Sequence, residues 1–137
     1  ISLSRSPSMA SPLFIEGDRD KLIQVMTNLL SNAVKYSPKG GDIQVKSQKE
    51  SQDAHVCIED QGMGIPPDAL EHIFMPYNRI NSEKTRYIQG TGLGLAIVYE
   101  IITMHKGRVW AESTLGQGSQ FHFTLPLLAT TIQDNPR

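Results

Sequence analysis

The sequence is poor in the features that mark disulfide-linked, zinc-binding or membrane-spanning proteins. Its 137 residues include one cysteine, Cys57, so no disulfide can form within the chain, and no Cys/His pairs stand at metal-ligand spacing. No apolar run approaches the roughly 20 residues that a membrane helix needs, and no secretory signal pattern opens the chain. The formal net charge is −1, so the chain has no excess of positive charge that would attract nucleic acid or an anionic membrane. We therefore expect no nucleic-acid partner and no direct membrane contact.

The chain length predicts one domain with a single core, because 137 residues are too few for two stable domains of ordinary size. The serine-rich residues 1–10 are expected to be a linker or tail remnant. Residues 11–126 would form the domain, opening with a short edge strand around 13–15, and residues 127–137 a disordered tail. Cys57 lies in an alternating run and is expected to be a small buried residue.

Periodicity predicts three helices and, after the short edge strand, four further strands within the domain. Apolar residues recur at helical spacing in a segment capped by Asp18 or Asp20 and ending near Tyr36. The later elements are strands around 43–45 and 56–58 with a hairpin loop at 48–53, helices over 66–73 and 93–105, and strands over 109–112 and 120–125. This order predicts an α/β fold, a two-layer sandwich with helices on one face of a mixed sheet. The alternating strands leave the other face to water.

The first candidate site residues lie on one face of the first helix. Asn28, Asn32 and Lys35 are spaced i, i+4 and i+7, which we expect to lie opposite the apolar stripe. Neutral amides can give an oxygen to Mg²⁺ that is held mainly by triphosphate oxygens and water, and lysine offers phosphate a point charge. An ordinary solvated face is the alternative, although two asparagines in mid-helix cost helix propensity.

The second candidate is the run that follows the strand around 56–58. Asp60 ends that strand, and a carboxylate there could accept a hydrogen bond from an exocyclic amine such as that of adenine. Gly62 and Gly64 would let the backbone turn tightly beneath a flat base. An ordinary turn is the alternative, and the run has too few oxygen ligands for a calcium loop.

The third candidate is a glycine cluster at residues 90–94, placed directly before a helix. Its free N–H groups could bind phosphate, although a flexible hinge is the alternative. No Gly-Lys-Ser/Thr follows, and a polar loop rather than a strand precedes it, so neither a Walker loop nor a dinucleotide fingerprint is present. Between the glycine clusters, residues 74–77 are expected to pack into the core. Residues 78–89 read as a mobile loop whose cations, Arg79, Lys84 and Arg86, could close over phosphates or simply be solvated.

Four ordered segments together resemble one known family. Residues 28–36, 60–64, 74–77 and 90–95 resemble the N, G1, F and G2 boxes of the catalytic ATP-binding domain of sensor histidine kinases. This domain belongs to the Bergerat-fold ATP-binding superfamily. The resemblance covers about residues 18–126. It implies an α/β sandwich that binds ATP and Mg²⁺ beneath a flexible lid.

The resemblance also implies residue roles. Asn32 would be the magnesium ligand, with Asn28 supporting metal and phosphate, and Lys35 and Arg79 would reach phosphate. Tyr36 would pack near the base, Asp60 would bind the adenine amine, and Tyr77 replaces the usual phenylalanine. The implied nucleotide-binding set is Asn28, Asn32, Lys35, Tyr36, Asp60, Gly62, Gly64, Ile65, Tyr77, Arg79, Gly90, Thr91, Gly92, Leu93, Gly94 and Leu95, of which Asn28, Lys35 and Arg79 are the catalytic candidates.

Residue 28 bears on the reaction. Hydrolysing relatives tend to carry glutamate there as a general base, whereas Asn28 cannot take a proton near neutral pH. We therefore expect slow ATP hydrolysis, as suits a kinase that reserves its phosphoryl group.

The family's phosphoacceptor histidine stands in a separate dimerisation domain, followed by an acidic residue and a basic-Thr-Pro stretch. None of the four histidines has such surroundings, and each is expected to be structural or on the surface: His55, His72, His105 and His122. That domain of the same kinase, and a downstream response regulator, would be the partners. We expect a monomeric domain, a homodimeric parent kinase and a cytoplasmic location. Two alternatives stay open: a serine kinase or ATPase of the same superfamily, and a non-enzymatic nucleotide-binding module.

Overall fold

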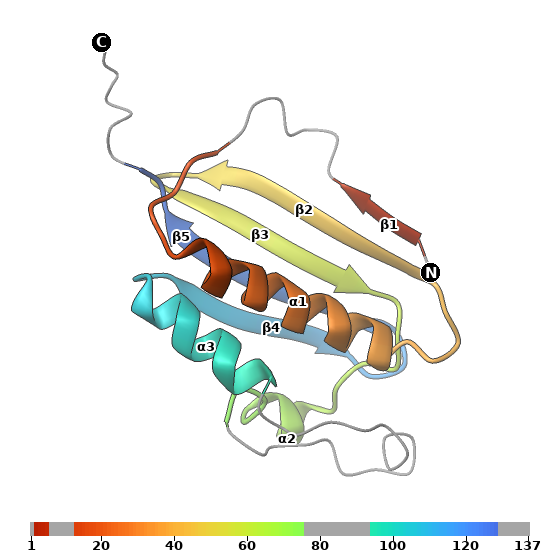
Figure 1. Ribbon diagram of the computed structural model, residues 1–137. Coiled ribbons are helices and arrows are strands. Elements are labelled where there is room, and N and C mark those ends of the chain that lie inside the picture. Colours follow the sequence, from red (N-terminus) through yellow and green to blue (C-terminus); the bar gives the residue numbers. More distant parts are fainter. Residues whose placement is uncertain (1, 6–12, 76–93, 129–137) are drawn as a thin grey trace.

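The computed structural model describes residues 13–75 and 94–128 and the backbone of residues 2–5. Its elements run along the chain in the order expected for a sandwich of helices on a sheet (Figure 1). They are β1 (Ser2–Arg5), α1 (Arg19–Lys35), β2 (Asp42–Glu50), β3 (Asp53–Asp60), α2 (Pro67–Leu70), α3 (Gly94–Met104), β4 (Arg108–Thr114) and β5 (Gly118–Pro126).

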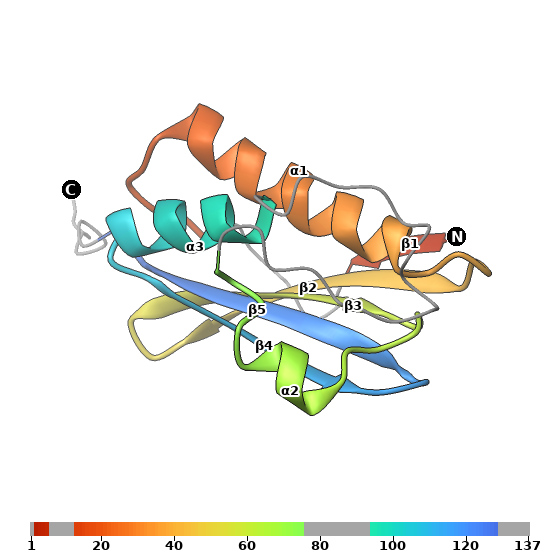
Figure 2. The same ribbon diagram turned by 90° about the horizontal axis from the view of Figure 1, so that it is seen from below.

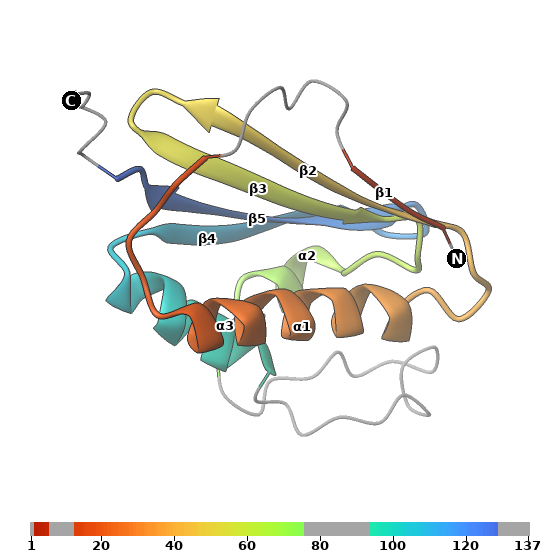
Figure 3. The ribbon, with the colours of Figure 1, turned by 45° about the horizontal axis from the view of Figure 1, so that its top comes forward.

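The sheet is mixed and its order is β1-β2-β3-β5-β4. β1 pairs with β2 in parallel, whereas the other neighbours are antiparallel. α1 and α3 lie side by side over one face of this sheet (Figures 2 and 3). The predicted two-layer α/β sandwich is therefore confirmed. The predicted lid, at residues 78–89, lies outside the described residues.

Helix α1 begins where its capping residue predicts. The side chain of Asp18 accepts a hydrogen bond from the backbone N–H of Lys21 at 3.2 Å, which satisfies one of the free donors of the first turn. Asp20 lies inside that turn, so of the two predicted caps Asp18 is the one used. The helix ends one residue before Tyr36, and the predicted bounds are confirmed.

The core lies between the inner sheet face and the two long helices. Alternate residues of β3 and β5 point inward, and Leu29 of α1 and Ile102 of α3 are almost fully buried against them. Each element thus contributes one apolar face, as its periodicity predicts. The buried cluster is Val25, Leu29, Ala33, Ile43, Ile58, Ile65, Ile73, Val98, Ile101, Ile102, Phe121, Phe123 and Leu125.

The N-terminal segment differs from the prediction. Residues 2–5, expected to be linker, form strand β1 at the sheet edge, in register from Ser2 with Asp42 to Arg5 with Val45. A short edge strand pairs through its backbone, so a serine-rich segment can form one without an apolar alternation. The strand expected at 13–15 is not formed: Ile15 makes only an isolated bridge to Leu127.

The β2–β3 hairpin is also tighter than predicted. The expected loop at 48–53 shrinks to a two-residue turn at Ser51 and Gln52, with Ser51 at φ 58°. Gln48 and Glu50 are exposed side chains of β2 that point away from the helices. Polar residues on the water-facing side of a strand imitate a loop in the sequence.

The outer sheet face carries a row of polar contacts across its strands. His55 on β3 and His122 on β5 lie with Nε2 and Nδ1 2.9 Å apart. Their other ring nitrogens lie 3.0 Å from Glu50 and 3.1 Å from Glu112. Trp110 stacks on both rings, at 5.5 and 5.0 Å between centroids. These two histidines are structural, as predicted.

His105 is structural as well, because it ties the end of α3 to the start of α1. Its Nδ1 donates to the carbonyl of Ile101 at 2.8 Å, and its Nε2 accepts from the N–H of Asp18 at 3.0 Å. His72, by contrast, lies on the surface with its Nε2 3.9 Å from Glu71. None of the helices in the described ranges is both long and apolar enough to cross a bilayer.

Cys57 is buried on β3, as predicted, and this leads to a testable expectation. Burial is the main cause that raises the pKa of its thiol to about 11. At pH 8 only about one thiol in a thousand is then the reactive thiolate. We expect iodoacetamide to modify the folded protein at least about 100-fold more slowly than the urea-unfolded protein, measured by mass spectrometry at pH 8. Equal rates in the two states would contradict this assignment.

Candidate functional site

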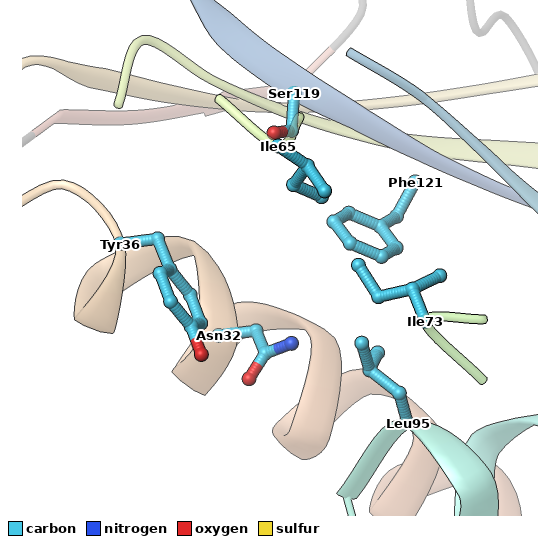
Figure 4. A pocket seen from close by; sticks show the side chains of 7 residues that line it. All are labelled: Asn32, Tyr36, Ile65, Ile73, Leu95, Ser119 and Phe121. Atoms are coloured by element: carbon cyan, nitrogen blue, oxygen red, sulfur yellow. The ribbon is translucent and has the colours of Figure 1, made fainter. Parts of the chain in front are cut away.

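A pocket opens between α1 and the inner sheet face, beside the start of α3. The side chains that line it converge from both layers (Figure 4). Its cavity volume is about 30 Å³, and the empty space counted together with its open mouth is about 390 Å³. Its lining residues are Asn32, Tyr36, Ile65, Ile73, Leu95, Ser119 and Phe121.

Asp60 supplies a buried carboxylate next to this pocket. It ends β3 directly opposite Ser119, a lining residue, and is 5% exposed. The carboxylate accepts hydrogen bonds from the backbone N–H groups of Gly62, at 2.8 Å, and of Ser119. Burial nevertheless outweighs these donors and raises the pKa of Asp60. A carboxylate has about four acceptor positions, so Asp60 can still accept from a ligand donor.

The loop after Asp60 is held by backbone hydrogen bonds on both sides. The N–H of Met63 donates to the carbonyl of Tyr36, at the end of α1, at 3.0 Å. Its carbonyl accepts from the N–H of Gly116, in the β4–β5 turn, at 2.7 Å. The N–H of Ile65 donates to the hydroxyl of Ser113 on β4 at 2.7 Å. The loop therefore bridges the helix layer and the sheet.

The two glycines of this loop permit close approach between protein backbones. A Cβ on Gly62 would collide with the carbonyl of Tyr36, and one on Gly64 with the carbonyl of Thr114. Gly64 also has φ +76°, a conformation that other residues rarely adopt. Contacts within the protein are thus sufficient to explain why glycine stands at these two positions.

The polar residues of α1 flank its buried stripe instead of lying opposite to it. Asn28 and Asn32 are half-buried and face α3 and the pocket, whereas Lys35 is exposed at the end of the helix. The expectation of an opposite face is wrong, because a step of 100° per residue puts residue 32 about 20° from the buried Val25.

Asn28 links α1 to the first residue of α3. Its side-chain Nδ2 donates to the carbonyl of Gly94 at 3.2 Å. Gly94 begins α3, and Leu95 lines the pocket one residue later. Asn28 thus holds the end of the second glycine cluster against the first helix. The remaining predicted site residues lie outside the described ranges: Tyr77, Arg79, Gly90, Thr91, Gly92 and Leu93.

Four further residues at the site were missed by the sequence reasoning. Ile73 and Phe121 add apolar walls, Ser119 adds a hydroxyl, and Ser113 anchors the loop from behind. Ser119 could be found only once the strand register was known, because that register pairs it with Asp60. Ser113 could not, because its role depends on how the loop after Asp60 folds back.

The site offers few ligands to a metal ion. Residues 13–75 and 94–128 contain no group of three His, Cys, Asp or Glu side chains arranged to hold a metal. A divalent ion there would take oxygens from neutral side chains such as Asn32 and from the ligand itself. That donor set suits Mg²⁺, which keeps much of its coordination for water and phosphate.

The comparisons with known proteins agree with this geometry. Residues 17–129 match the family described as histidine kinase-, DNA gyrase B- and HSP90-like ATPase. Over 116 residues, the chain is 41% identical to the sensor histidine kinase WalK of Bacillus subtilis, covering 83% of this chain and 19% of WalK. It is 43% identical to the adaptive-response sensory kinase SasA of Synechococcus elongatus, covering 84% of this chain and 30% of SasA.

Solved structures give the same result. The mycobacterial sensor histidine kinase MprB superposes with a TM-score of 0.78 at 31% identity, covering 92% of this chain and 82% of that one. Full-length ShkA in complex with AMPPNP gives a TM-score of 0.76 at 28% identity, covering 92% and 25%. The chain spans about a fifth to a third of the length of the curated relatives it matches.

Proposed function

Because the chain belongs to the histidine kinase-, DNA gyrase B- and HSP90-like ATPase family, we propose that it transfers the γ-phosphoryl group of ATP to a histidine. It is the ATP-binding catalytic domain of the sensor histidine kinase type. The acceptor would be a histidine of the dimerisation domain of the same kinase, and a response regulator would receive the group from there.

The observation that carries the proposal is the buried Asp60 carboxylate beside an apolar pocket. Ile65, Ile73 and Phe121 provide apolar walls for a base, and Asp60 would provide an acceptor for its exocyclic amine. Tyr36 lines the same pocket from the end of α1. The solved complex of ShkA with AMPPNP supports a nucleotide as the ligand.

Neutral and cationic groups would hold the phosphates and the metal. Asn32 lines the pocket and fits a single amide ligand for Mg²⁺, and helical spacing puts Asn28 and the exposed Lys35 on the same side of α1. When bound, Mg²⁺ neutralises charge on the phosphate oxygens. We propose that Arg79 and the backbone of residues 90–95 complete the phosphate site, in line with the motif resemblance.

The chain offers no general base at position 28. The amide of Asn28 donates to Gly94 and cannot take a proton from water near neutral pH. Slow hydrolysis of ATP by the domain alone is therefore part of the proposal. We further propose a monomeric domain, a homodimeric parent and a cytoplasmic location, which suits ATP use and the free thiol of Cys57.

Radiolabel transfer tests the proposed function. The protein is mixed with a dimerisation domain that carries the acceptor histidine, with γ-labelled ATP and Mg²⁺. Acid-labile label on histidine is expected. Acid-stable label on serine would point to a serine kinase, and ATP binding without any transfer would point to a purely binding module. Either result would overturn the proposal.

Substitution of Asn28 by aspartate tests the link between α1 and α3. The change places a carboxylate oxygen against the carbonyl oxygen of Gly94 and removes the donor. We expect ATP affinity to fall about tenfold, as for the loss of one hydrogen bond with repulsion added. Gln24→Glu, which adds the same charge at an exposed position of α1, is the matched control. Equal affinities for the two variants, measured by calorimetry, would contradict the role of this link.

A further inference from the structure

Ser113 lies behind the base pocket, and its hydroxyl has three polar neighbours. Its Oγ accepts from the backbone N–H of Ile65 at 2.7 Å and donates to the carbonyl of Gly118 at 2.9 Å. The hydroxyl of Ser119 lies 3.0 Å away. Ser113 is not among the residues that line the pocket, whereas Ile65 and Ser119 are.

We propose that Ser113 is a positioning residue that fixes the direction of the Ser119 hydroxyl and so favours adenine over guanine. The inference rests on the proposed function, because it concerns the specificity of the same nucleotide site. It assigns a role to a side chain that would not itself touch the nucleotide.

The direction of the hydrogen bond between Ser113 and Ser119 follows from the donors and acceptors that surround Ser113. A serine hydroxyl has one hydrogen to donate and two lone pairs to accept. The carbonyl of Gly118 can only accept, so a hydrogen bond to it at 2.9 Å uses the single hydrogen of Ser113. The N–H of Ile65 can only donate, so it occupies one lone pair of Ser113. Either hydroxyl could donate across their 3.0 Å contact by distance alone, but with the hydrogen of Ser113 used on Gly118 we infer that Ser119 is the donor and Ser113 the acceptor.

This arrangement leaves Ser119 with only lone pairs for the pocket. Its neighbour Asp60, the register partner on β3, is also an acceptor when ionised. Because Asp60 lies beside Ser119, the polar end of the proposed site then carries acceptors from both strands. The exocyclic amine of adenine brings two N–H donors to such an end. Guanine carries a carbonyl oxygen at that position, which would face acceptors without a partner.

Removal of the Ser113 hydroxyl should release this constraint. In Ser113→Ala the hydrogen of Ser119 loses its acceptor and is free to turn into the pocket, where it could donate to a guanine oxygen. We expect the preference for ATP over GTP, taken as the ratio of dissociation constants, to fall about tenfold, the size of one hydrogen bond. Ser113→Thr, which keeps the hydroxyl, should restore the preference.

A double-mutant cycle measured by calorimetry with ATP and GTP tests whether Ser113 acts through Ser119. Ser119→Ala should lower the ratio by itself, and adding Ser113→Ala should then change it no further. A merely structural role would weaken both nucleotides equally and leave the ratio unchanged. That result, or an equal drop in ratio with and without Ser119, would overturn the inference.

Nucleotide binding by the wild-type protein distinguishes a failure of the proposed function from a failure of the proposed role of Ser113. Binding of neither nucleotide would refute the proposed function. Binding of both nucleotides with equal affinity would refute only the role of Ser113. Thermal melts establish that each variant is folded. If Ser113→Ala does not fold, Ser119→Ala decides, because an unchanged ratio in that variant also overturns the inference.

Discussion

Substitution of Asp60 by asparagine is expected to weaken ATP binding about 10- to 100-fold without destabilising the protein. The carboxylate accepts from two backbone N–H groups and would accept from the adenine amine. An asparagine presents one oxygen and one NH₂ group, so a donor must face either the backbone N–H groups or the ligand. Loss of a hydrogen bond to a charged group costs roughly 1.5–3 kcal/mol.

The same substitution is expected to leave the stability of the fold unchanged or to increase it, although it weakens ATP binding. Burial raises the pKa of Asp60 in the fold above its unfolded value. The ionised carboxylate therefore costs folding free energy at neutral pH, and this cost disappears as the pH falls through the folded-state pKa. Asp60→Asn removes the charge, so its melting temperature at pH 7 should equal or exceed that of the wild type.

Calorimetry and thermal melting at pH 7 test both parts. ATP binding by the wild type should also weaken on acidification, because a protonated Asp60 is a poorer acceptor for the adenine amine. A variant that binds ATP within threefold of the wild type would contradict the role of Asp60 in base recognition. A large drop in melting temperature would instead show that the carboxylate is needed by the fold.

Substitution of Gly62 by alanine is expected to lower the free energy of unfolding by about 3 kcal/mol, the upper range for overpacking. The added Cβ would collide with the backbone carbonyl of Tyr36, which cannot rotate away. That carbonyl also accepts the hydrogen bond of Met63, so relief of the collision breaks the bond between the loop and α1.

Gly116→Ala is the matched control for this prediction. Gly116 has φ +86° but no atom within 4 Å of an added Cβ, so its substitution carries only the backbone cost of a left-handed conformation, roughly 1–2 kcal/mol. Urea denaturation of the two variants separates steric collision from conformational strain. Equal losses of stability would show that the approach of Gly62 to Tyr36 is not the cause.

Much of the fold follows from local signals in the sequence. The cap at Asp18 and the apolar spacing around Leu29 determine α1 because both signals act within the helix itself. Strand β1 was missed because an edge strand is defined by the backbone of its neighbour, which no local pattern reveals. The length of the β2–β3 hairpin was missed for a related reason: residues such as Gln48 are polar because they face water, not because they lie in a loop.

Some residues of the candidate site could likewise be predicted from the sequence, and others could not. Asp60, Asn32 and Leu95 could be named from motifs, and the structure brings Asn32 and Leu95 into one pocket with Asp60 beside it. The purpose of Gly62 could not be read from its motif, since its close neighbour, the carbonyl of Tyr36, lies 26 positions earlier in the chain. Ser113 could not be found either, because its contacts depend on three segments meeting.

The bonds of Met63 to both layers have a consequence for the entropy of ligand binding. A loop whose backbone is already fixed by the ends of α1 and of the β4–β5 turn loses little conformational freedom when a base enters. The part of the site that we propose for the base is thus preorganised, and its hydrogen bonds can contribute to affinity without first offsetting the cost of ordering the chain.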